Sequence, residues 1–69
     1  MHFKEIEPTV ETWNEHDFLF DNAKDYVKAI SALQNAGIKN FGVGLDEERR
    51  ISTDTKHDAE KIREIIIVL

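Results

Sequence analysis

Residues 21–45 constrain the fold more than any other stretch, because they join a helix pattern, a stop signal and a strand pattern. Apolar residues recur there at three- and four-residue steps, which places them on one face of a helix. They are Ala23, Tyr26, Val27, Ala29, Ile30 and Leu33. Asp21 can accept a backbone N–H at the helix start. Gly37 suits the left-handed residue that ends a helix, with Ile38 folding back onto the last turn.

A strand is expected directly after this helix. Phe41, Val43 and Leu45 alternate with Gly42 and Gly44, and a period of two is typical of a strand with one apolar face. That face would cover the helix. The glycine face is bare, which indicates that something packs closely on it or that the strand bends.

The remaining elements follow from shorter signals. Residues 2–7 predict an edge strand that ends at Pro8, and residues 17–21 predict a second strand, with a polar turn over residues 12–16. A charged turn at 46–50 leads to a return strand at 50–53. Thr55 and Asp58 then form a variant of the capping box at the start of a second helix.

These elements give one α+β domain over residues 1–69, with the order β(β)αββα. We expect a small, mostly antiparallel sheet with two helices on one face. The alternative is that the first twenty residues form a helix or an irregular arm.

Composition narrows the class of protein. The chain has 69 residues, no cysteine and 33% charged residues, so neither a disulfide nor a zinc–thiolate site can form. No apolar run approaches the length of a membrane span, and no signal peptide is visible at the amino terminus. We therefore expect a cytoplasmic protein.

The charge is concentrated at the amino terminus. The first 21 residues hold six acids and one base, Lys4, which accounts for the whole net charge of −5. The acids are Glu5, Glu7, Glu11, Glu15, Asp17 and Asp21. Such asymmetry marks either an interaction surface or a solvated flank that aids solubility.

The interaction reading predicts an acidic surface aimed at a basic partner protein, because complementary charge steers and selects partners. Phe18 and Phe20 in the same stretch are expected in the core, whereas Trp13, between polar neighbours, is the better candidate for an interface anchor. The predicted partner-binding residues are Glu5, Glu7, Glu11, Trp13, Glu15 and Asp17.

The sequence gives little support for a metal-binding, phosphate-binding or catalytic site. Metal donors are offered by Glu15, His16, Asp17 and Asp21, but strand neighbours point to opposite faces and the spacing matches no metal template. Gly42-Val43-Gly44 is too short for a phosphate loop and leads into an acidic turn. No nucleophile–base arrangement stands out. We expect no catalytic residues, no metal, no cofactor and no enzymatic activity.

The resulting hypothesis is a small acidic module that binds a partner protein and regulates or inhibits it. Its size and charge are similar to those of small phage-encoded inhibitors, including nucleic-acid mimics of the anti-CRISPR kind that act on basic nucleic-acid-binding proteins. This is a likeness of class, carried by length and charge alone.

Two alternative functions remain. The C-terminal run is apolar almost all round, so it is either held in the core or available for self-association. The residues concerned are Ile65, Ile67, Val68 and Leu69, and the core placement is the preferred interpretation. Direct nucleic-acid binding would use Lys24, Lys28, Lys39, Arg49 and Arg50, but the acidic pI near 5.0 opposes it.

Overall fold

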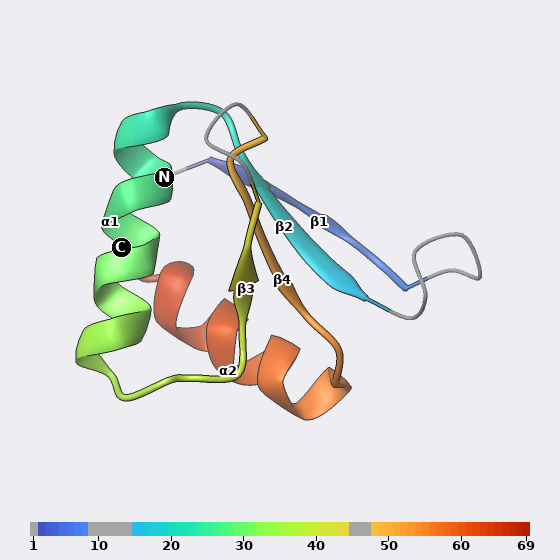
Figure 1. Ribbon diagram of the computed structural model, residues 1–69. Helices are drawn as coiled ribbons and strands as arrows, with labels where there is room; N and C mark the ends of the chain where they lie inside the picture. The colour runs from blue at the N-terminus through green and yellow to red at the C-terminus, as the bar shows by residue number, and fades with distance from the viewer. Residues whose placement is uncertain (1, 9–14, 45–47) are drawn as a thin grey trace.

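The computed structural model describes residues 2–8, 15–44 and 48–69. Their element order is β1 (Phe3–Ile6), β2 (His16–Phe20), α1 (Ala23–Asn35), β3 (Gly42–Val43), β4 (Arg50–Thr53) and α2 (Lys56–Ile66). The strands pair antiparallel in the order β1-β2-β4-β3, and both helices lie on one face of the sheet (Figure 1). The predicted α+β fold is therefore confirmed, with β1 at an edge.

The core lies between the sheet and the two helices. Strand residues on the helix side, Phe18, Phe20 and Ile51, meet Leu33 of α1 and Ile62 of α2, and all five are buried. Phe3 of β1 packs against both phenylalanines, with ring centroids 6.0 and 5.8 Å away. The expected core positions of Phe18 and Phe20 are confirmed.

Helix α1 begins one residue later than predicted. Asn22, and not Asp21, is the N-cap: the N–H of Asp25 donates to its Oδ1 at 2.8 Å, and its Nδ2 donates back to the Asp25 carboxylate at 3.2 Å. An amide can donate as well as accept, so Asn22 serves both bonds where an aspartate at the cap could only accept.

The helix ends as the sequence predicts. Gly37 has φ of 78° and its N–H donates to the carbonyl of Gln34, while the N–H of Ile38 donates to that of Leu33. These two bonds form a Schellman motif, and Ile38 packs against the core.

The expected cover of α1 by β3 is incomplete. Val27 is 59% exposed and Val43 is 56% exposed, although both belong to predicted apolar faces. Strand β3 is only two residues long and stands at the edge of the sheet, so it covers little of the helix. Gly42 packs against nothing, since a Cβ there would meet no atom within 4 Å. At Gly44, by contrast, a Cβ would meet Glu48 and Arg50 closely.

The second helix starts at the predicted cap. The N–H of Asp58 donates to the Thr55 hydroxyl at 3.1 Å, and that hydroxyl donates to the Asp58 carboxylate at 2.7 Å. The preferred placement of the helix end was wrong, because Ile67 and Val68 are 64% and 79% exposed. Ile65 and Leu69 pack against the core from one side, which leaves the other side of the turn uncovered.

Candidate interaction surface

Antiparallel pairing brings three strand boundaries to one end of the sheet. Ile6 at the end of β1 pairs with Asp17 near the start of β2, and Thr53 at the end of β4 pairs with His16. Residues just outside these boundaries must therefore lie close together, although they are far apart in sequence. We call this end of the sheet the acidic end, defined by Glu7, Glu15 and Asp54.

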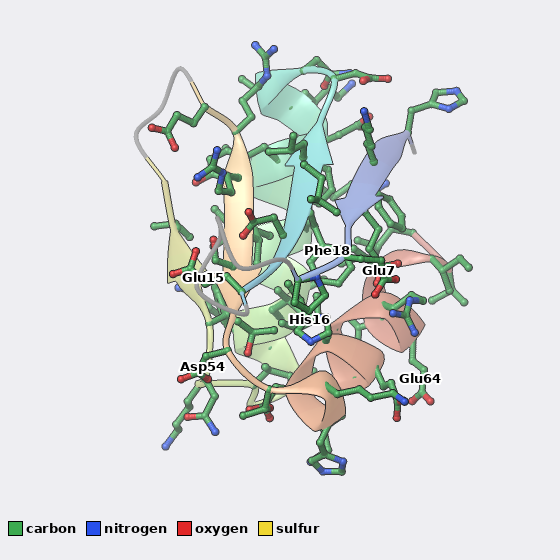
Figure 2. All side chains as sticks on the ribbon, turned by 90° about the vertical axis from the view of Figure 1, so that its right-hand side faces the viewer. Glu7, Glu15, His16, Phe18, Asp54 and Glu64 are labelled. Carbon is green, nitrogen blue, oxygen red and sulfur yellow. The ribbon has the colours of Figure 1, made fainter. Side chains whose placement is uncertain are left out.

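All three carboxylates of the acidic end are exposed. They follow β1, precede β2 and follow β4, which are successive neighbours in the sheet. Figure 2 shows them on the same half of the molecule, with Glu64 of α2 on that side as well. Neighbouring strands lie about 4.8 Å apart, so the three strand ends span about 10 Å. This end of the sheet therefore carries three negative charges, of which Glu7 also acts electrostatically on Arg63 of α2.

Two other predicted interface residues take different positions. Glu5 lies on the helix side of β1, where Arg63 of α2 donates to both of its carboxylate oxygens, with 2.8 Å between Nε and Oε2. Asp17 points to the helix-free side of the sheet and is only 3% exposed. Glu11 and Trp13 lie outside the described residues.

Pairing shifts the pKa of both Glu5 and Arg63. Hydrogen bonds from Arg63 lower the pKa of Glu5 below its ordinary value of 4.5, against a smaller opposing effect of desolvation. The same bonds raise the pKa of Arg63. Glu5 is thus paired within the chain, whereas Glu7 and Glu15 are exposed.

Sequence reasoning missed the hollow beside the acidic end. It encloses about 520 Å³ and is lined on its acidic side by Glu15, Asp54 and Asp58, and elsewhere by Lys39, Phe41, Gly42 and Ser52 among others. The hydroxyl of Thr53 donates to the carbonyl of Asn40 at 2.9 Å, which fixes the segment before β3 against β4. Asp54 could have been found in the sequence, because it directly follows a predicted strand that returns towards Glu15.

The basic residues considered for nucleic-acid binding are partly occupied. Arg49 donates from Nε to the carbonyl of Phe20 at 3.0 Å, and Arg50 lies 3.7 Å from the carboxylate of Glu48. Lys24, Lys28 and Lys39 are exposed. In residues 2–8, 15–44 and 48–69, no group of three or more metal-binding side chains is placed to hold an ion.

Comparisons with protein-family models, curated proteins and solved structures find no match for this chain. No helix in the described part of the chain is long and apolar enough to cross a membrane.

Proposed function

We propose that the chain is a small protein-interaction module whose acidic end binds a basic protein and so regulates or inhibits it. The observation that supports this is the convergence of Glu7, Glu15 and Asp54, three exposed carboxylates from three separate segments. A row of like charge on a fixed scaffold attracts a positive surface and repels negative ones. Because each carboxylate is next to the end of a strand, little conformational entropy is lost on binding.

The partner that best fits is a nucleic-acid-binding protein. Its phosphate-binding surface presents lysine and arginine side chains to a regular series of negative charges. Three carboxylates spaced over about 10 Å provide such a series in miniature. Occupying that surface would exclude the nucleic acid, so binding alone would inhibit.

The first experiment is capture of partners from a lysate at low and high salt, followed by affinity measurements on any basic protein recovered. Reversing each charge singly, by Glu7→Lys, Glu15→Lys or Asp54→Lys, should weaken binding about tenfold and flatten its dependence on salt. Asp21→Lys is the matched control, because it makes the same change of charge at the other end of β2.

Two results would count against the proposal. One is the recovery of no basic protein at low salt. The other is a loss of affinity in Asp21→Lys equal to that in the three acidic-end variants, which would mean that only net charge matters.

A second candidate function is self-association through the C-terminal turn. The observation that favours it is the exposure of Ile67 and Val68, two adjacent apolar side chains that nothing in the described chain covers. This surface is separate from the acidic end, and its test is given below.

A further inference from the structure

Four large apolar side chains in the described part of the chain are exposed, and they form two separate surfaces. Ile67 and Val68 are neighbours on the C-terminal turn. Val27 of α1 and Val43 of β3 belong to the second surface, where the helix faces the edge of the sheet. Single exposed apolar side chains are normal in soluble proteins, but adjoining ones mark interaction sites. Each pair is therefore a candidate contact surface.

The second surface is a groove between α1 and β3. It encloses about 430 Å³, and we call it the apolar groove, defined by its lining residues Ile30, Gln34, Ile38, Lys39, Phe41 and Val43. Val43 is the register partner of buried Ile51, so its side chain points to the helix side of the sheet. Val27 lies one turn before Ile30 on α1 and extends the apolar lining. Because β3 is an edge strand, no described strand closes the groove from outside.

The two surfaces carry opposite charges. Among the described residues, Lys39 is the one charged side chain that lines the apolar groove, and it is exposed. The C-terminal turn is bordered by an acid instead. Glu64 precedes Ile67 by three residues and Val68 by four, which places this exposed carboxylate on the same side of α2. The surfaces therefore match both in apolar character and in charge.

The C-terminal turn and the apolar groove lie at opposite edges of the sheet. Arg63, in the last turn of α2, donates to Glu5 of β1, so the end of this helix lies beside β1. Strands β1 and β3 are the two edges of the sheet. Figure 2 shows the same separation, with β3 at the left margin and the end of α2, near Glu64, at the right. The turn cannot reach the groove of its own chain, so a contact between them requires a second copy.

We propose that the C-terminal turn of one copy binds in the apolar groove of another. The proposal rests on the second candidate function, self-association, and identifies the surface that the turn contacts. Ile67 and Val68 enter the groove, and Glu64 of the same copy pairs with Lys39 of the other. One contact thus removes all four exposed apolar side chains of the described residues from water.

The proposed contact is heterologous, because it joins two different surfaces. Each copy keeps a free turn at one end and a free groove at the other, so copies add head to tail. A two-fold contact between two C-terminal turns fits less well. It would bring two copies of Glu64 together and would leave the apolar groove uncovered.

A pair of complementary variants tests the proposal. Val43→Lys disrupts the groove and Val68→Lys disrupts the turn, and both should fold because both positions are exposed. In sedimentation equilibrium each variant alone should stay monomeric where the mass of the natural chain rises, since association weakens at least about tenfold. An equimolar mixture should reach twice the monomer mass and no more, because it offers one intact turn and one intact groove.

The matched control is Ala36→Lys. It adds the same charge at an exposed position that lines neither surface, and it should associate like the natural chain. A natural chain that stays monomeric, or a mixture of Val43→Lys and Val68→Lys that stays monomeric, would overturn the proposal. If Val43→Lys alone associates as strongly as the natural chain and Val68→Lys does not, the groove is wrong and self-association through the turn stands.

Charge reversal tests the orientation of the turn in the groove. Lys39→Glu should weaken self-association about fivefold, because it places a like charge opposite Glu64. Adding Glu64→Lys to this variant should restore the association of the natural chain. A double variant that associates no better than Lys39→Glu would overturn the pairing of these two residues.

Discussion

At the scale of single residues, Glu5 shows how a surface charge can become a structural one. Its carboxylate receives two hydrogen bonds from Arg63, which ties the edge strand β1 to α2 across most of the chain. Both side chains keep contact with solvent, at 21% and 38% exposure, so the pair contributes about 1 kcal/mol at most. The pair connects β1 directly to the helix layer.

The first residue-scale prediction concerns pH. Because Arg63 lowers the pKa of Glu5 in the folded state, the stabilisation from the pair is present above the unfolded-state pKa. It is lost as pH falls through the lower folded-state pKa. Glu5→Gln should therefore lower stability at neutral pH and make stability fall less steeply below pH 4.5, as measured by urea unfolding across this range.

The control for this prediction is Glu64→Gln, which removes the same charge from an exposed position on α2. It should leave both the stability at neutral pH and its decline in acid close to those of the natural chain. Identical acid profiles for Glu5→Gln and the natural chain would show that the pair has no role in acid unfolding.

At the scale of elements, the joint between α1 and β3 depends on Gly37. Its φ of 78° lies in the left-handed region, where a Cβ comes too close to a carbonyl oxygen. Gly37→Ala should destabilise the fold by about 1 kcal/mol. Urea unfolding at neutral pH measures the change.

Gly42→Ala provides the comparison within the same chain. Gly42 has no positive φ and its missing side chain faces open space, so alanine there should leave stability unchanged or raise it slightly. If the two alanine variants proved equally stable, the conformation of Gly37 would not be limiting.

At the scale of the whole molecule, the exposed C-terminal turn bears on oligomeric state. Self-association through Ile67 and Val68 predicts that sedimentation equilibrium shows mass rising with concentration, and that Val68→Lys abolishes the rise. The variant should fold normally, because Val68 is 79% exposed. A natural chain that stays monomeric at the highest concentration rules this candidate out.

Much of the architecture could be predicted from the sequence, because its local signals agree. The apolar stripe of α1, the stop at Gly37 and the cap at Thr55 all depend on neighbours within four residues. What escaped prediction depends on distant pairing. The exposure of Val27 follows from the shortness of β3, and the bond between Glu5 and Arg63 joins opposite ends of the chain.

The candidate site was predictable only in part for the same reason. Glu7 and Glu15 stood out because six of the acidic residues are concentrated in the first 21 positions of the chain. Asp54 joins them only through the pairing of β2 with β4. The burial of Asp17 is likewise a property of the assembled sheet, since alternation along a strand gives its side but not its neighbours.

The strand order β1-β2-β4-β3 also determines how the chain reaches its native state. Strand β2 pairs with β4, and all of α1 and β3 lie between them in sequence. The β1–β2 and β3–β4 pairs are local in sequence and can form early. The sheet is complete only when β2 pairs with β4, and this pairing costs the conformational entropy of closing the segment between them. We therefore expect the docking of β2 onto β4 to be the slow step of folding. Phe18 and Ile51 are register partners across these two strands, so their contact would form in that step.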